Sequence, residues 1–163
     1  MPAIRRAELA DLPAITAIYN EAIRNTVSTM DTIEKSVAER RAWFDIHTGP
    51  HPILVAEQDG VVAGWASLSE WSNRPAYSLT AEGSVFIHAD YRSKGIGKLL
   101  LTELLEAGKA AGLHLIIARI ATVNETSLRM CLGLGFTDVG VMKESGFKFG
   151  KYIDISVLQY LYK

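Results

Sequence analysis

The segment from Arg92 to Lys98 contains the residues best suited to bind a ligand. Glycine lets backbone N–H groups approach phosphate oxygens closely, and a helix that starts at such glycines adds positive potential. This combination indicates a pyrophosphate site made of Arg92, Ser93, Lys94, Gly95, Ile96, Gly97 and Lys98. The alternative interpretation is a glycine-rich strand-to-helix turn whose basic side chains are simply solvated.

Two elements must position this segment. A strand is expected over residues 80–88, because apolar and polar residues alternate there, and a helix is expected over 97–111, where leucines recur on one side. The segment lacks the third glycine of the dinucleotide fingerprint and the spacing of a Walker A loop. The segment therefore does not predict a binding site for NAD or ATP.

The remaining elements predict a mixed α/β fold. Asp59-Gly60 between two apolar runs indicates a tight hairpin, and Ser36 with Glu39 indicates a capping box at a helix start. Helices are expected over 12–23, 37–48 and 124–133, and further strands over 3–6, 53–57, 61–69, 113–121, 136–143 and 152–161. This order has more strands than a nucleotide-binding βαβ repeat supplies. No linker or repeat divides the chain, so a single domain is expected over residues 1–163.

The composition excludes several classes of protein. Seventeen Lys and Arg against 18 Asp and Glu give a formal net charge of −1, which offers no overall field for nucleic acid or an anionic membrane. Cys131 is the one cysteine, so no intrachain disulfide can form, and the four histidines show no metal-ligand spacing. The first residues do not have the pattern of a secretion signal. We therefore expect a cytoplasmic protein without a metal.

Several segments together resemble one family of enzymes. Arg92, Gly95 and Gly97 match the acetyl-CoA loop of the GCN5-related N-acetyltransferase (GNAT) superfamily. The chain resembles the phosphinothricin acetyltransferase branch of this superfamily more closely. The segments that carry this resemblance are Arg74-Pro75-Ala76-Tyr77, Thr80-Ala81-Glu82, Ser84-Val85-Phe86-Ile87, Gly146-Phe147-Lys148 and Gly150. The resemblance covers nearly the whole chain.

The resemblance implies a GNAT fold and acetyl-CoA as co-substrate. Such a fold has a mixed central sheet of six to seven strands flanked by about four helices, and it is splayed between the strands near 80–88 and 113–121. The residues that would bind the cofactor are Val85, Phe86, Ile87, Arg92, Ser93, Lys94, Gly95, Ile96, Gly97, Lys98, Asn124 and Ser127. For Asn124, a role as a helix N-cap is an alternative that can coexist with cofactor contact.

The resemblance also suggests which residues would carry the reaction. An amine must be neutral to attack a thioester, and Glu82 would take its proton directly or through water. The alternative for Glu82 is a strand-surface glutamate in an ordinary ion pair. A backbone N–H of Val85 or Ile87 would stabilise the oxyanion.

The acceptor would be recognised by the segment that precedes Glu82. Arg74 would bind an acceptor carboxylate, with Tyr77 beside it, because guanidinium pairs with a carboxylate through two hydrogen bonds. The alternative is an exposed loop arginine. Cys131 replaces the tyrosine or histidine that relatives carry at that position. Its thiol could protonate the leaving thiolate or could be a small buried apolar group, and the inert interpretation is favoured.

These residues predict an acetyl-CoA-dependent N-acetyltransferase that acts on a small amino acid or an analogue such as phosphinothricin, methionine sulfoximine or methionine sulfone. A polyamine, aminoglycoside or protein N-terminus is the alternative acceptor within the same class. A non-catalytic acyl-CoA-binding module is the alternative from another class. The resemblance further implies a homodimer with the acceptor site near its interface.

Overall fold

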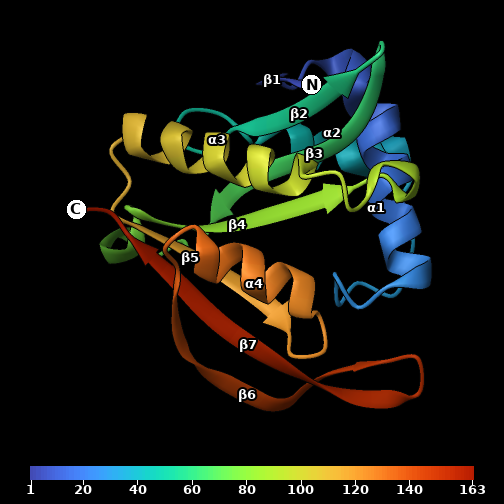
Figure 1. Cartoon of the computed structure of the whole chain (residues 1–163). Coiled ribbons are helices and arrows are strands. Elements are labelled where there is room, and N and C mark those ends of the chain that lie inside the picture. Colours follow the sequence, from blue (N-terminus) through green and yellow to red (C-terminus); the bar gives the residue numbers. More distant parts are fainter.

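A computed structural model describes residues 1–163 (Figure 1). The strands are β1 (Ala3–Arg6), β2 (Ile53–Gln58), β3 (Val61–Glu70), β4 (Thr80–Ile87), β5 (Leu115–Ala121), β6 (Thr137–Lys148) and β7 (Lys151–Leu161). The α-helices are α1 (Leu12–Asn25), α2 (Val37–Asp45), α3 (Ile96–Ala110) and α4 (Glu125–Gly133). Short 3-10 turns occupy Leu9–Asp11, Pro75–Tyr77 and Ala89–Tyr91.

All seven strands form one mixed sheet. Their spatial order is β1-β2-β3-β4-β5-β7-β6, and every neighbouring pair is antiparallel except β4 and β5, which run parallel. The crossover between those parallel strands is α3, as a parallel pair requires. The predicted fold class of six to seven strands and four helices is confirmed.

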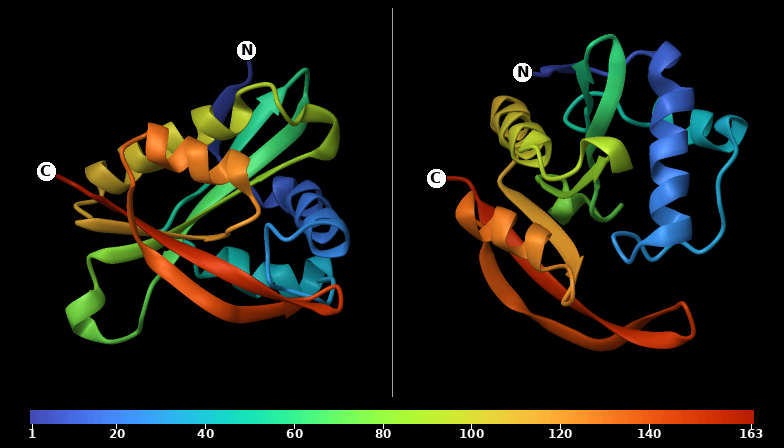
Figure 2. Two further views of the ribbon diagram at one scale, coloured as in Figure 1. Left: turned by 60° about the horizontal axis from the view of Figure 1, so that its bottom comes forward. Right: turned by 45° about the vertical axis from the view of Figure 1, so that its right-hand side comes forward.

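Helices cover the sheet on both faces (Figure 2). On one face, Leu100 and Leu104 of α3 pack in one buried cluster with Leu68 of β3 and Ile116 of β5. On the other face, α1 packs against β2 and β3 in a second cluster that contains Trp65. The side chains of β3 and β4 alternate between these two faces, so the sequence pattern decides which residues each helix covers.

Most local predictions are confirmed. Asp59 and Gly60 both have positive φ, 54° and 75°, in the turn between β2 and β3, as a two-residue hairpin favours. The Ser36 hydroxyl accepts a hydrogen bond from the Glu39 N–H, and the Glu39 side chain accepts one from the Ser36 N–H. The capping box therefore starts α2 where the sequence predicted it.

Some expectations differ in detail. α2 ends at Asp45 instead of near residue 48. β6 continues to Lys148 instead of ending at 143, because two bulges, at 138–140 and 142–146, absorb the residues that break its alternation. None of the helices has both the length and the apolar character needed to cross a lipid bilayer.

Asp11 occupies the N-cap position of α1 but does not cap it with its side chain. Its carboxylate accepts hydrogen bonds from Arg5 at 2.8 and 2.9 Å and from the Glu8 N–H at 2.7 Å. The Arg5 hydrogen bonds hold the pKa of this carboxyl below its usual value. Asp11 therefore ties β1 to the start of α1.

Candidate functional site

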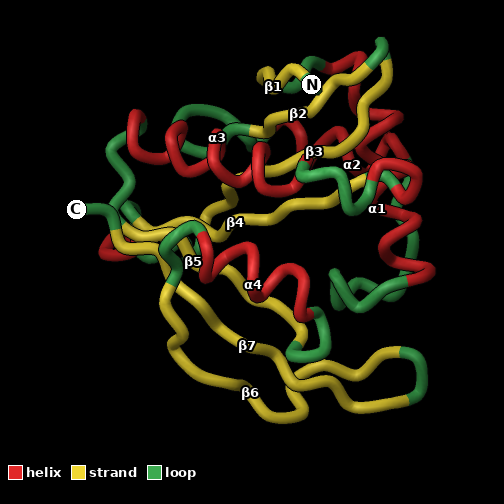
Figure 3. The backbone as a smooth tube through the Cα atoms, in the orientation of Figure 1, coloured by secondary structure: helices red, strands yellow, loops and turns green.

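Strands β4 and β5 separate part-way along their length (Figure 3). Their last paired residues are Glu82 and Ile117, whereas β4 continues to Ile87 and β5 to Ala121. The splayed sheet that the sequence resemblance predicted is thus present, and it leaves one edge of β4 without a neighbouring strand.

The register of β4 decides which backbone groups lie on this free edge. The His88 N–H donates to the Ala63 carbonyl oxygen at 2.8 Å, and β3 and β4 remain in register from there to Glu70. Because backbone groups alternate sides along a strand, Val85 and Ile87 direct theirs away from β3 and into the opening. Phe86 bonds toward β3, so a ligand in the opening can meet only its side chain.

The segment after β4 presents backbone N–H groups at the start of α3. Gly95 has φ +80° and precedes the first helical residue, Ile96, and no side chain caps this end of the helix. The N–H groups of Ile96, Gly97 and Lys98 have no acceptor within the helix. A Cβ on Gly97 would lie 3.3 Å from the Met130 sulfur, so glycine permits close packing of this turn on α4.

The basic side chains of this segment have different environments. Arg92 donates to Glu21 of α1 at 2.5 Å. Lys94 and Lys98 have no carboxylate partner, and Lys94 lies 5.3 Å from the centre of the Tyr91 ring. Free N–H groups beside unpaired lysines fit a diphosphate.

Asn124 is the N-cap of α4, which is the alternative role that the sequence suggested for it. Its side-chain oxygen accepts from the Ser127 N–H at 3.3 Å. Asn124 also borders a shallow hollow of about 410 Å³ formed with residues 25–28, Val123 and Phe149. A cap and a ligand contact are both compatible with this position.

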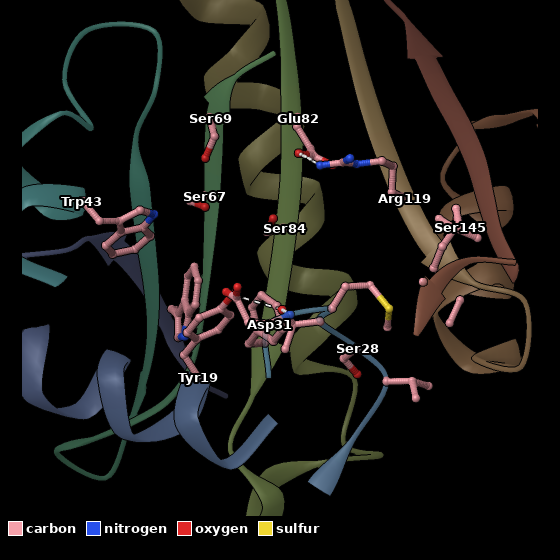
Figure 4. Close-up of a pocket in the computed structure, with 18 of the residues that line it drawn as sticks. Tyr19, Ser28, Asp31, Trp43, Ser67, Ser69, Glu82, Ser84, Arg119 and Ser145 are labelled. Atoms are coloured by element: carbon pink, nitrogen blue, oxygen red, sulfur yellow. Dashed lines mark hydrogen bonds and ion pairs between the residues drawn. The ribbon is translucent and has the colours of Figure 1, made fainter. Parts of the chain in front are cut away.

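A cavity of about 630 Å³ lies on the sheet face opposite α3 (Figure 4). Its walls come from β3, β4, β5, α1, α2, the segment after α1 and the β6–β7 hairpin. The strands contribute Trp65, Ser67, Ser69, Glu82, Ser84, Phe86, Arg119 and Ala121. The other elements contribute Tyr19, residues 27–31, Arg40, Trp43, Met142, Ser145, Gly146 and Ile155.

Glu82 and Arg119 face each other across this cavity wall (Figure 4). Arg119 Nε and Nη2 donate to the two carboxylate oxygens of Glu82 at 2.5 and 2.8 Å. These hydrogen bonds raise the pKa of the Arg119 guanidinium. Glu82 is therefore ion-paired, as the alternative interpretation expects, and it also lines the cavity.

Comparison with known proteins identifies the family. Residues 15–136 match the acetyltransferase (GNAT) family. The chain belongs to the GNAT family of acetyltransferases. It is 40% identical over 158 residues to the L-methionine sulfoximine/L-methionine sulfone acetyltransferase of Pseudomonas aeruginosa, which covers 96% of this chain and 92% of that protein.

Two other relatives agree with this assignment. The L-amino acid N-acyltransferase MnaT of Escherichia coli is 36% identical over 157 residues, covering 96% of this chain and 91% of the relative. The phosphinothricin acetyltransferase of Sinorhizobium meliloti, solved in complex with acetyl-CoA, superposes with a TM-score of 0.95 at 38% identity, covering 98% of this chain and 88% of that one. The prediction of an acetyl-CoA-dependent acetyltransferase is confirmed.

Arg74 and Tyr77 lie away from the cavity of this acetyltransferase. Both are exposed on the turn between β3 and β4, and neither side chain belongs to the cavity wall. Within one chain, the structure therefore does not bring the predicted carboxylate ligand to the cavity. The geometry corresponds to the alternative of an exposed loop arginine.

Cys131 is a buried core residue of the acetyltransferase. It is 3% exposed on α4 and packs in the cluster that contains α3, and burial raises the pKa of its thiol to about 11. It does not line the cavity. The inert interpretation fits this placement.

Sequence reasoning missed most of the cavity wall outside β4. The polar residues of the wall that were not predicted include Tyr19, Asp31, Arg40, Ser67, Ser69 and Arg119. Tyr19 lies in the helix predicted over 12–23, and its hydroxyl donates to Asp31. One usable signal was Arg40 itself, because it is a charged residue on a helix face that must turn toward the sheet.

Proposed function

We propose that this acetyltransferase transfers the acetyl group of acetyl-CoA to the α-amine of a small amino acid or analogue, with Glu82 as the general base. The observation that carries the proposal is the position of Glu82. It lies in the cavity wall at the last pair that joins β4 to β5, directly before the free β4 edge begins. A base and a ligand-binding edge therefore adjoin one cavity.

The chain offers a continuous set of groups for the coenzyme. Acetyl-CoA supplies the activated acetyl thioester. The N–H and C=O groups of Val85 and Ile87 pair with amide groups in the opening, and the N–H groups of residues 92–98 hold the diphosphate. Phe86, Asn124 and Ser127 complete the proposed contacts, with Phe86 acting through its side chain.

Glu82 removes the proton that the amine must lose. A carboxylate oxygen has lone pairs beyond those that Arg119 occupies, so the ion pair does not block proton transfer. Arg119 holds the carboxylate at the cavity wall. Proton transfer proceeds directly or through one water, as general base catalysis permits.

The size of the cavity supports a small acceptor. Its volume of about 630 Å³ falls in the range of about 300–1,000 Å³ typical of small-molecule sites. The names of the relatives at 36–40% identity specify L-amino acids, methionine sulfoximine and methionine sulfone. The proposed acceptor class follows from these two observations together.

A panel of amines tests the proposal. Release of the coenzyme thiol is followed with methionine sulfone, methionine sulfoximine, phosphinothricin, spermidine and an aminoglycoside. We expect turnover with the amino-acid analogues and much less with the cationic amines. Tight acetyl-CoA binding without turnover of any amine would instead identify a non-catalytic binding module.

The proposed assembly is a homodimer of one-domain subunits. The β6–β7 hairpin leaves several large apolar side chains exposed, namely Val139, Val141, Phe147, Phe149 and Tyr152. Such a surface is typical of a contact between subunits. Arg74 and Tyr77 would join an acceptor site only from a neighbouring subunit. Light scattering tests the proposal, and a monomer at micromolar concentration would contradict it.

A further inference from the structure

Arg40 differs from the other basic residues around the cavity because no acceptor meets its guanidinium. Arg119 is paired with Glu82, and Lys148 donates to the carbonyl oxygens of Thr26 and Thr29. Arg40 Nε and Nη2 are enclosed and have no hydrogen-bond partner. Arg40 is 7% exposed and lines the cavity.

Aromatic rings hold this guanidinium in place. Its central carbon lies 3.5 Å from the ring centre of Trp43, 4.6 Å from that of Tyr19 and 5.5 Å from that of Trp65. Such rings attract a cation but accept no conventional hydrogen bond from its edge. Trp65 Nε1, another enclosed donor of the same wall, also lacks an acceptor.

The unmatched groups all have one polarity. Buried N–H donors are normally satisfied, so donors without acceptors around one cavity indicate a missing acceptor. The carboxylate of Asp31 already accepts from the Tyr19 hydroxyl. Nη1 is the one guanidinium nitrogen that is not among these enclosed, unpartnered donors, and the Arg40 side chain lines the cavity. The ligand expected here is a planar anion that bonds the side of the guanidinium facing the cavity.

We propose that Arg40 binds the carboxylate of the acceptor amino acid. This inference rests on the proposed function and adds the residue that selects for the carboxylate. It replaces Arg74 in that role within one chain, because Arg74 lies outside the cavity.

The strand register gives suitable spacing for such an acceptor. Trp65 pairs with Phe86, Ser67 with Ser84 and Ser69 with Glu82. At about 3.3 Å per residue, Ser84 lies about 7 Å along the strand from either neighbouring pair. An α-amine at Ser84 can thus reach Glu82 through one water, while its carboxylate extends toward the rings that surround Arg40.

A matched pair of acceptors tests the proposal. The values of kcat/KM are measured for methionine sulfone and for its carboxamide, which keeps the amine but lacks the negative charge. The variants are Arg40→Met, Arg40→Lys and Arg74→Met. Arg41→Met is the matched control, because Arg41 is the next residue of α2, is exposed and pairs with Asp45 outside the cavity.

We expect Arg40→Met to lower kcat/KM for methionine sulfone about 100-fold, mainly through KM, and to change the carboxamide value less than threefold. Arg40→Lys keeps the charge but loses the two-pronged geometry, so the preference for the carboxylate should fall by a smaller factor. The KM for acetyl-CoA should not change. Arg41→Met should behave as the parent protein.

Several outcomes would overturn the proposal. If Arg40 only stacks against the aromatic rings, Arg40→Met will lower kcat/KM for both acceptors by the same factor. If Arg74→Met removes the preference for methionine sulfone over its carboxamide while Arg40→Met keeps that preference, Arg74 is the carboxylate ligand. Should Arg40→Met fail to fold, an unchanged preference in Arg40→Lys is decisive against the proposal. Failure of the parent protein to acetylate either acceptor would reject the proposed function itself.

Discussion

The carboxylate of Glu82 accepts two hydrogen bonds from Arg119 at the last residue pair that joins β4 to β5. The ion pair therefore bridges the two strands where their backbone pairing stops. It places a carboxylate at the cavity wall, and it joins β4 to β5 at the point where the two strands begin to separate. The carboxylate proposed as the general base is therefore also one partner of the contact that links the two strands.

The first prediction concerns the coupling between these two residues. Glu82→Gln should lower kcat by about 100-fold or more while the KM for acetyl-CoA stays similar, because the proton acceptor is lost. Arg119→Met should lower kcat by about tenfold, since it leaves Glu82 in place but unheld. The double variant should be no slower than Glu82→Gln. Steady-state thiol release measures all three, and multiplicative losses would contradict a shared role.

A second prediction concerns the bend at Gly95. Gly95→Ala creates no clash, but its φ of +80° is costly for alanine, so unfolding free energy should fall by about 1 kcal/mol and coenzyme A should bind more weakly. Gly133→Ala is the control, because Gly133 has open space and no positive φ. Urea denaturation and calorimetry provide the measurements. Unchanged coenzyme affinity in Gly95→Ala would show that the bend at Gly95 is not part of the diphosphate site.

The third prediction is that Cys131 takes no part in catalysis. Burial raises the pKa of its thiol to about 11, so very little thiolate exists at pH 8. The native protein should react with an alkylating reagent only as it unfolds, and Cys131→Ala should retain kcat. Loss of kcat in a variant with unchanged thermal stability would assign the thiol a role in the reaction.

Acid stability provides a fourth prediction. The hydrogen bonds from Arg5 lower the pKa of Asp11 in the folded state, so the resulting stability is present above the unfolded value of about 3.9. It is lost as the pH falls through the lower, folded pKa. Asp11→Asn should cost about 1–2 kcal/mol at pH 7, and the difference from the parent protein should shrink below about pH 4.

Denaturant unfolding at a series of pH values measures this effect. Asp45→Asn is the control, because Asp45 forms an exposed ion pair with Arg41. Exposed pairs contribute little, so its free energy of unfolding should change by less than about 0.5 kcal/mol at every pH. A constant difference for Asp11→Asn down to pH 2 would contradict the role of its ionised carboxylate.

The fifth prediction concerns Lys148, which is 4% exposed and donates to the carbonyl oxygens of Thr26 and Thr29, each at 2.8 Å. These bonds tie the β6–β7 hairpin to the segment after α1. The hairpin and that segment both contribute residues to the cavity wall. Lys148→Met should therefore raise the acceptor KM about tenfold with a smaller change in kcat. Hydrogen exchange over residues 26–31 should become faster.

Lys151→Met is the matched control for this tether. Lys151 pairs with Lys148 across the hairpin but is exposed. It should leave acceptor KM and hydrogen exchange unchanged. Equal effects of the two substitutions would show that the hairpin responds to any loss of charge and not to the tether.

The local features of this acetyltransferase could be read from the sequence because their physical causes are local. The Asp59-Gly60 turn, the Ser36 capping box and the leucine pattern of α3 each depend on residues within a few positions of one another. Glu82, which lines the cavity, and Gly95, whose φ is positive, could be singled out because both lie in short motifs that resemble those of the family. These signals, together with the resemblance, were sufficient for the fold class and for the separation of β4 from β5.

The tertiary structure decided which distant residues complete the cavity. Arg119 meets Glu82 only because β5 lies parallel to β4, and Arg40 reaches the same cavity only because α2 packs near Trp65. Arg74, chosen for its chemistry, lies outside it. Side-chain type and spacing specify short-range hydrogen bonds. Partners far apart in the sequence, such as Glu82 and Arg119 at 37 residues, are set by strand order and helix packing, which depend on the whole core.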